Sequence, residues 1–382
     1  HKLLVDQKAG YLVGDPVSIT SKEDNEQALE AVNEILGDNF NDVLPELVKN
    51  ASNKGVEWLH VYIDNEGNFD YIIIPAQEFI PIYDNSNRKN LVGGIRYYEL
   101  DDDTVKIELW DDQTVTYYES LNGQIYLDAS VEENPQSHFK YGNNGYGWGR
   151  VPFIGFANNE EQVSDVVFYK DFIDAYDNLT SDTTNTLEDI QEIMYILKGY
   201  DDTNLAEFSV NVKRYKAIKV SEEGGVDTVQ AEVPIDSVNS HLDRLINNIY
   251  QFGEGVNLDT DKFGNSPSGI ALKFLFSSLD MKASVMERKF TKALEKFMWF
   301  IGEYLSIAEN VDIDPKDIGF TFNKSMLMNE FEQSQIAMNS KGIISDDTIL
   351  ANHPWVTDPE REKQRMEEQA PVNLDEGKEH DE

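Results

Sequence analysis

The chain has 382 residues, a formal net charge of −39 at pH 7 and a hydrophobic content of 40%. That content is too high for a disordered acidic chain, so the sequence predicts a folded protein of two or three units whose acidic surface repels nucleic-acid phosphates unless they are neutralised or confined. The lack of cysteine excludes disulfides and thiolate metal sites, and no apolar run reaches the ~18 residues of a membrane span.

The first 160 residues are expected to form a helix followed by many short strands. The chain begins at His1 without an initiator methionine or a signal-peptide pattern, so we expect the original N-terminus to be missing. Asn25 to Leu47 has a helical period, with Gly37 as a stop signal. The period then changes to two, which predicts these strands: Val56–Ile63, Phe69–Ile74, Phe79–Tyr83, Ile95–Leu100, Thr104–Trp110, Thr114–Glu119 and Gln124–Leu127.

Turn signals between these strands, such as Asn65-Glu-Gly and Asn122-Gly123, favour one antiparallel meander. The aspartates of the turns lack the spacing of an EF-hand loop, so we do not expect a calcium site there. Tyr141-Gly-Asn-Asn-Gly-Tyr-Gly-Trp-Gly lacks the Gly-Lys-Ser/Thr ending of a phosphate loop and is interpreted as a flexible loop.

Two helices are expected around a small β unit in the middle of the chain. Glu161 to Leu197 is helical in period, and Gly199 ends it. Phe208–Val212, Ala217–Val220 and Asp227–Ala231 are predicted as short strands, too few to be stable alone. Asp236 to Phe252 predicts the second helix.

Charge is unevenly distributed over this middle region. Ten acidic residues and one basic residue, Lys170, lie between Glu160 and Glu192. This pattern indicates either a solvated helix face or a functional acidic face. The densest basic cluster of the chain follows, with partner docking, DNA contact and local charge balance all open; its residues are Lys213, Arg214, Lys216 and Lys219.

The strongest pattern is a long helix from Ser266 to Ala308, roughly 60 Å at ~1.5 Å per residue. Two apolar rows with a seven-residue step share one face: Leu272, Leu279, Met286, Ala293 and Phe300, and Phe276, Ala283, Phe290, Phe297 and Tyr304. The opposite face is charged, with Lys273, Lys282, Glu287, Arg288, Lys292, Glu295 and Lys296. Periodicity alone leaves open that this is a core helix or coiled coil of an ordinary domain.

The C-terminal region predicts a strand at Ile318–Phe322, a helix at Asn329–Met338, a helix capped by Ser345 and running to Asn352, and a further helix starting at Asp358-Pro359. The acidic residues from Gln369 to Glu382 are expected to be disordered.

Several of these segments, taken in order, resemble tailed-bacteriophage portal proteins of the siphophage type. They are Gly10-Tyr-Leu-Val-Gly-Asp-Pro-Val, Arg150-Val-Pro-Phe-Ile-Gly-Phe-Ala-Asn-Asn, Tyr169-Lys-Asp-Phe-Ile-Asp-Ala-Tyr-Asp, Ser268-Gly-Ile-Ala-Leu-Lys-Phe-Leu, Met286-Glu-Arg-Lys-Phe and His353-Pro-Trp-Val-Thr-Asp-Pro-Glu. The resemblance covers Gly10 to Glu368 and implies an α+β portal fold whose copies form a ring.

The resemblance divides the chain into named parts. They are a wing over 1–160, a first stem helix over 161–200, a clip over 201–233, a second stem helix over 234–252, a tunnel loop over 253–269, a long wing helix over 270–310, a return strand over 311–328, crown-like helices over 329–368 and an acidic disordered tail over 369–382. It places Asp259, Asp261, Lys262, Phe263 and Asn265 in the channel, the basic cluster at subunit or partner contacts, and Asp171, Asp174, Asp177 and Asp182 on an acidic stem face.

The function implied is that of a DNA channel at one capsid vertex of the virion, assembled in the host cytoplasm, for packaging and ejection of double-stranded DNA. The implied partners are the other copies of a twelvefold ring, the terminase large subunit, head-completion adaptor proteins, and the major capsid and scaffolding proteins. The resemblance implies no cofactor, no metal, no enzyme activity and no membrane.

Two other classes of function stay open from the residues. A carboxylate-dependent metal nuclease would suit a chain with 71 acidic residues, but the six histidines are scattered and no His-Glu-x-x-His or Walker lysine is present. An acidic DNA-mimic or adaptor protein would form small assemblies with basic proteins.

Overall fold

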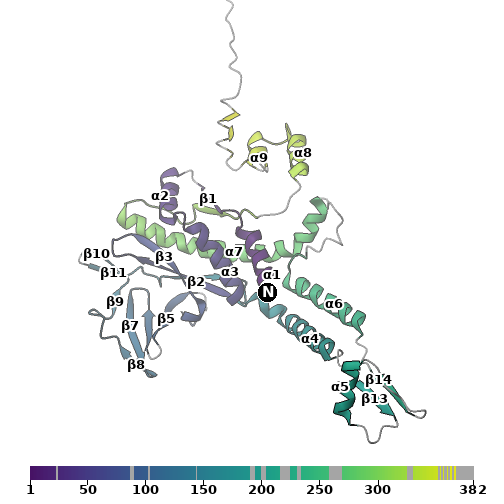
Figure 1. Ribbon diagram of the computed structural model, residues 1–382. Coiled ribbons are helices and arrows are strands. Elements are labelled where there is room, and N and C mark those ends of the chain that lie inside the picture. The colour runs from purple at the N-terminus through teal and green to yellow at the C-terminus, as the bar shows by residue number, and fades with distance from the viewer. Residues whose placement is uncertain are drawn as a thin grey trace, which may run out of the picture.

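A computed structural model of the chain shows a mixed α+β body with a long helical arm. It describes residues 1–22, 25–86, 90–101, 104–142, 144–189, 194–198, 204–215, 224–229, 234–257, 269–324, 330–351, 353, 356, 359, 362–363 and 365–366. In Figure 1 the body lies at the left, the arm projects to the lower right, and a small helical C-terminal part lies above the body.

The core of the body is built on helix α7, Gly269–Ala308, as the heptad pattern predicts. Both predicted apolar rows face inward: Met286, Phe290 and Phe297 are completely buried, and Phe290 packs edge-on against Phe156 of strand β12. The expected caps of this helix, Ser266 and Pro267, lie outside the described residues.

Three shorter helices contribute to the same core as α7. They are α1 (Lys2–Val13), α2 (Glu26–Leu36) and α3 (Phe40–Lys54). The predicted helix from Asn25 to Leu47 is therefore two helices, because Gly37 adopts φ +59° at the end of α2. Asn25 starts α2 by accepting a hydrogen bond from the Ala28 backbone amide.

Two sheets replace the single predicted meander. The first has the order β12-β2-β3, from β2 (Val56–Ile63), β3 (Phe69–Ile74) and β12 (Phe153–Ala157). The second is an antiparallel meander with β9 paired to β7, and consists of β4 (Phe79–Tyr83), β5 (Leu91–Asp101), β6 (Thr104–Trp110), β7 (Thr114–Leu121), β8 (Gln124–Leu127) and β9 (Gln136–Ser137). Several strand bounds match the prediction.

The first sheet is a middle layer, and this explains the split. Along β2, Leu59 and Val61 face the helices of the main core, whereas Trp58 faces a second core that contains Trp110 of the meander. The two sheets therefore pack as separate layers that share the second core. The short turn η1 (Ala76–Glu78) leads from one sheet to the other.

Smaller elements complete the body. Strand β1 (Ser18–Ser21), which the sequence pattern did not reveal, pairs antiparallel with the predicted return strand β15 (Ile318–Thr321). A hairpin of β10 (Phe139–Tyr141) and β11 (Asn144–Tyr146) covers part of the glycine-rich segment. Beyond β15 come α8 (Glu330–Ser340) and α9 (Asp346–Ala351), and the Ser345 hydroxyl accepts the Thr348 amide as an N-cap.

The arm consists of two helices and a small tip. Helix α4 (Lys170–Asp189) follows the short turn η2 (Asp165–Phe168) and leads outward, and α6 (Ile235–Gly253) returns. The tip between them contains β13 (Met194–Lys198), α5 (Leu205–Tyr215) and β14 (Gly225–Val229), with β13 and β14 paired antiparallel.

Two predictions for the arm were wrong. Met194 to Leu197 is strand rather than the end of the first helix, because a run of apolar residues fits either state and pairing with β14 decides it. Phe208–Val212 is helix rather than strand: the Asn204 side chain caps α5 at the amides of Ala206 and Glu207, which outweighs the β propensity of two valines. The predicted strand at Ala217–Val220 and the acidic tail lie outside the described residues.

The burial of α7 gives a first prediction. Replacing the completely buried Phe290 with alanine should lower the free energy of unfolding by about 3–5 kcal/mol, because it removes buried apolar surface and leaves a cavity. Phe274→Ala, at a position of the same helix that is 76% exposed, should change it by less than about 0.5 kcal/mol. Urea unfolding followed by circular dichroism measures both, and equal effects would contradict the assigned face of α7.

Candidate functional site: an acidic arm anchored by buried charges

The arm is an antiparallel pair of helices with a thin core. Its two helices lie side by side in Figure 1, and the first turn of α4 meets the last turn of α6 where the rings of Phe172 and Phe252 stack with centroids 5.0 Å apart. Few arm residues are buried, and many apolar side chains stay exposed. They include Val167, Phe168, Leu187, Ile196, Val210, Tyr215, Ile235 and Phe252.

The four predicted acidic residues share one exposed face of α4. At about 100° per residue, Asp171, Asp174, Asp177 and Asp182 fall within an arc of about 140°. The partly buried Phe172, Tyr176 and Leu179 lie on the opposite side of the helix. Lys170, the single basic residue of α4, forms an i,i+4 ion pair with Asp174. The helix therefore packs with one face and presents carboxylates with the other.

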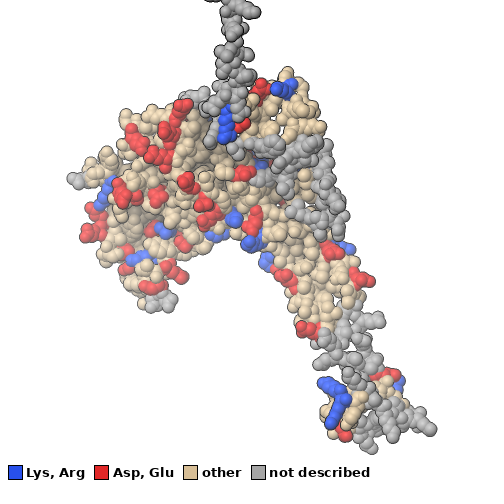
Figure 2. Space-filling model, turned by 45° about the horizontal axis from the view of Figure 1, so that its top comes forward, with Lys and Arg blue, Asp and Glu red and all other residues tan. Residues whose placement is uncertain are grey.

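The tip carries the described part of the basic cluster. Lys213 and Arg214 occupy the last turn of α5, where cations interact favourably with the negative end of the helix dipole. The Arg214 guanidinium lies 5.6 Å from the ring centroid of Tyr215. Figure 2 shows basic side chains at the far end of the arm. Lys216 and Lys219, like the predicted channel residues Asp259, Asp261, Lys262, Phe263 and Asn265, lie outside the described residues.

A buried network of charged and polar side chains anchors the arm to the body. The Asp165 carboxylate, at the start of η2, accepts hydrogen bonds from the Lys8 ammonium at 3.0 Å and from the Asn158 amide at 2.8 Å. The Lys282 ammonium of α7 lies 3.1 Å from the same carboxylate and donates a 2.8 Å hydrogen bond to the carbonyl of Gly253 at the end of α6. The carboxylate thus joins η2, at the base of α4, to α1, α7 and the segment after β12, and Lys282 extends the network to the end of α6.

The electrostatics of this network are asymmetric, because two ammonium groups share one carboxylate. Burial lowers the pKa of Lys8 to about 8, against the opposing attraction of Asp165 and with added repulsion from Lys282. The pKa of Asp165 is lowered as well: burial raises it, but the charges of Lys8 and Lys282 and the Asn158 hydrogen bond lower it further. The carboxylate therefore stays ionised, and Lys8 is the member that titrates closest to neutral pH.

Sequence reasoning missed this anchor, although one signal was present. Lys8 stands four residues after Leu4 and four before Leu12, in the middle of the buried face of α1, where a lysine needs a charged partner. Lys282 was predicted on the charged face of α7, but only 12% of its side chain is exposed. The partner, Asp165, lies far away in the sequence and could not be identified from the pattern.

The described residues contain no group of three or more histidine, cysteine, aspartate or glutamate side chains that could hold a metal ion. Among the same residues, no helix is long and apolar enough to cross a membrane.

The whole chain is similar to phage portal proteins. A family model described as "Phage portal protein, SPP1 Gp6-like" matches residues 1–371. The portal protein of Bacillus phage SPP1 is 44% identical over 377 residues, which cover 97% of this chain and 75% of that protein. The portal protein of Clostridium phage phiCD119 is 35% identical over 391 residues, covering 96% of this chain and 83% of that protein.

Solved structures with a similar chain include two from the neck of GTA particles. For the chain from the empty particle, the TM-score is 0.49 and the sequence identity is 10%, and the match covers 91% of this chain and 86% of that chain. The chain from the native particle has a TM-score of 0.48 and 9% identity, and covers 92% of this chain and 87% of its own.

The anchor generates a prediction about pH. Since the pKa of Lys8 is lower in the folded chain than its ordinary 10.5, the unfolded chain binds more protons above about pH 8, and stability due to Lys8 must rise with pH there. The stability of the wild type relative to Lys8→Met should therefore increase between pH 8 and about 9.5, by at most about 1.4 kcal/mol per pH unit.

Denaturant unfolding at several pH values measures this difference. Lys49→Met is the matched control, because Lys49 pairs with Asp6 at the surface with 51% of its side chain exposed, and it should show no such slope. A slope of zero or of opposite sign for Lys8→Met would contradict the buried position of its ammonium.

Proposed function

Because the chain belongs to the SPP1 Gp6-like family of phage portal proteins, whose role is DNA packaging, we propose that its copies close into a ring whose arms line a DNA channel. The ring has twelve copies, as the family resemblance suggests, and occupies one vertex of the virion capsid after assembly in the host cytoplasm. DNA enters through it during packaging and leaves through it during ejection.

The observation that carries this proposal is the two-sided character of α4. Its apolar side packs toward α6, and its other side presents Asp171, Asp174, Asp177 and Asp182 to solvent. Around a ring, one such helix from each copy forms an acidic wall. A basic wall would bind phosphates and hold the DNA, whereas an acidic wall offers few binding points. At 0.15 M salt the repulsion acts over only ~8 Å, so it keeps DNA off the wall without blocking the channel.

The ends of the arm fit two kinds of partner. The tip, with Lys213 and Arg214, lies farthest from the body and is proposed to dock the terminase large subunit and head-completion adaptors. The body is proposed to contact the major capsid and scaffolding proteins. The exposed apolar residues of the arm are covered by neighbouring copies. Because the copies are acidic and repel one another, the surfaces that touch must be apolar or must pair acidic with basic side chains.

Native mass spectrometry with negative-stain imaging tests the ring directly. We expect a closed ring of about twelve copies with a central hole, by the family resemblance. A chain that stays monomeric at 0.15 M salt with Mg²⁺ would contradict the proposal and direct attention to nuclease assays.

Ionic strength should control assembly. The net charge of −39 makes copies repel one another, and lowering the salt from 0.15 M to 0.01 M extends the Debye length from about 8 Å to about 30 Å. The fraction of chain in rings should therefore fall in dilute buffer without divalent ions. Rings that persist unchanged under those conditions would show that repulsion does not limit assembly.

Charge reversal tests which face lines the channel. Rings in which the four aspartates of α4 are replaced by lysine should retain linear duplex DNA, and retention should fall steeply with salt. They should not retain covalently closed circular DNA, because a closed circle cannot thread a channel. Gel mobility and filter binding with both DNA forms measure this.

The control carries the same charge change on the body. Glu26, Glu30 and Glu34 of α2 and Asp38 after it are exposed, and their replacement by lysine should bind linear and circular DNA equally. If the α4 variant also binds both forms equally, its acidic face lies outside the channel.

A further inference from the structure

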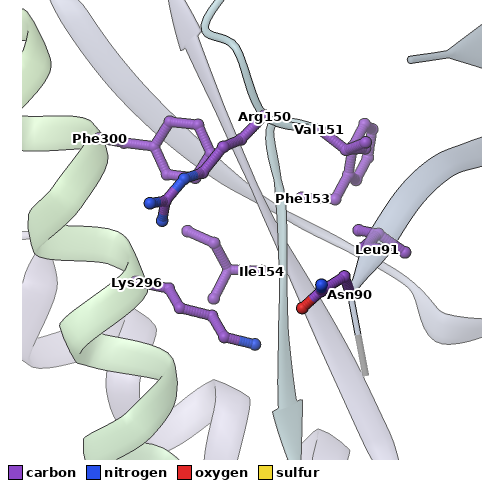
Figure 3. A pocket seen from close by; sticks show the side chains of 8 residues that line it. All are labelled: Asn90, Leu91, Arg150, Val151, Phe153, Ile154, Lys296 and Phe300. Carbon is purple, nitrogen blue, oxygen red and sulfur yellow. The ribbon is translucent and has the colours of Figure 1, made fainter. Parts of the chain in front are cut away.

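A pocket in the body is lined by two cationic side chains, those of Arg150 and Lys296. Neither has an acidic partner among the described residues. The pocket has a volume of about 430 Å³ and lies between α7 and the start of β12, lined by Arg150, Val151, Phe153, Ile154, Lys296 and Phe300 together with Asn90 and Leu91. Figure 3 shows Arg150 entering it from the segment before β12 and Lys296 from α7. No carboxylate is among the lining residues.

The two cationic side chains lack acidic partners among the described residues, in a chain whose acidic residues outnumber its basic ones by 71 to 32. Lys106, Lys282 and Lys324 each form salt bridges, the first and last with two carboxylates. Among the described residues, neither Arg150 nor Lys296 forms one.

One of the two cationic side chains, that of Arg150, has a fixed position. The Arg150 guanidinium lies 3.8 Å from the ring centroid of Trp299, the neighbour of Phe300 on α7, in a cation–π contact that fixes its position. The pKa of Lys296 is lowered by burial and by repulsion from Arg150 and Lys292. Among the described residues, the site therefore has excess positive charge without a neutralising carboxylate.

The pocket also lies at an open edge of a sheet. In the described part of the chain, β12 is an edge strand of the sheet β12-β2-β3, so one side of its backbone has no strand partner. An incoming segment can thus meet cationic side chains beside an edge strand.

We propose that this pocket receives a carboxylate side chain from a second copy of this chain, and so forms a specific contact between neighbours in the ring. Charge complementarity supports this contact. Every copy carries an excess of acidic residues, and a carboxylate that enters this pocket meets two cationic side chains and no other carboxylate among the lining residues. This inference rests on the proposed function, because it assumes that the copies form a ring. It assigns to the pocket an attractive contact between two acidic copies.

Cross-linking of the wild-type ring tests the contact. Rings assembled from an equal mixture of ¹⁵N-labelled and unlabelled chain are treated with a carbodiimide, which joins an ammonium group directly to a carboxylate as an amide. We expect cross-linked peptides that contain Lys296 and an aspartate or glutamate and that carry one heavy and one light member in about half of cases. Lys296 found only in pairs of a single isotope, or not cross-linked at all, would overturn the proposal.

Charge reversal provides a second, independent readout. Arg150→Glu and Lys296→Glu should each raise the concentration needed for half-maximal ring assembly by at least tenfold. Arg288→Glu is the matched control, because Arg288 is exposed on the same helix but does not line the pocket, and it should have a much smaller effect. Pocket variants that assemble like the control would contradict the contact.

The outcomes separate this inference from the proposed function. Absence of rings from the wild-type chain would defeat the proposed function itself. Wild-type rings with normal assembly of both pocket variants would defeat only the pocket contact. A third outcome is that inorganic phosphate protects Lys296 of the monomer from acetylation, while Lys296 forms no cross-link in the ring. That result would identify a small-anion site and overturn the proposed contact.

Discussion

One buried carboxylate, that of Asp165, links the base of the arm to the body. It binds Lys8 of α1 and Lys282 of α7, and Lys282 also binds the last turn of α6 through the Gly253 carbonyl. Removing one member of such a buried network leaves an unpaired charge and costs about 3–5 kcal/mol. Apolar packing alone would hold the thin base of the arm with little directional preference, whereas this network joins both arm helices to the core at fixed angles.

The second constraint is the charge of the surface. In the proposed ring, a chain with a net charge of −39 must fold and then associate with identical copies. Folding buries the apolar face of α7 and leaves the carboxylates on the outer face of α4 in solvent. Association needs a different solution, and the structure offers two: exposed apolar side chains along the arm and the cationic pocket beside β12. Acidity on the channel side and attraction at the contacts are then compatible within one chain.

Much of the fold could be predicted where a pattern is local. The seven-residue rows of α7, the bounds of β2, β3, β4, β6 and β8, and the cap at Ser345 follow from periodicity and turn chemistry. The errors arose where tertiary context decides, as in the division of the strands into two sheets, because Trp58 and Leu59 serve two different cores. The strand at Met194 and the helix at Phe208 were mistaken because a short apolar or β-branched run does not determine its own state.

The candidate site was less predictable than the fold. The shared exposed face of the α4 aspartates follows from their spacing in the sequence, whereas their place in a channel stays a prediction from the family resemblance. The anchor and the pocket could not, since each joins residues far apart in the sequence, such as Lys8 with Asp165 and Arg150 with Lys296. The family resemblance supplied the order of the parts, but no pairing of these side chains.

The central claim is that α4 lines a channel with its carboxylates, and a cryo-electron microscopy reconstruction of the assembled ring tests it most directly. The account predicts that Asp171, Asp174, Asp177 and Asp182 of every copy face the central hole, with α6 behind them. A ring in which these residues face a neighbouring copy or the outside, or in which α6 lines the hole instead, would contradict it.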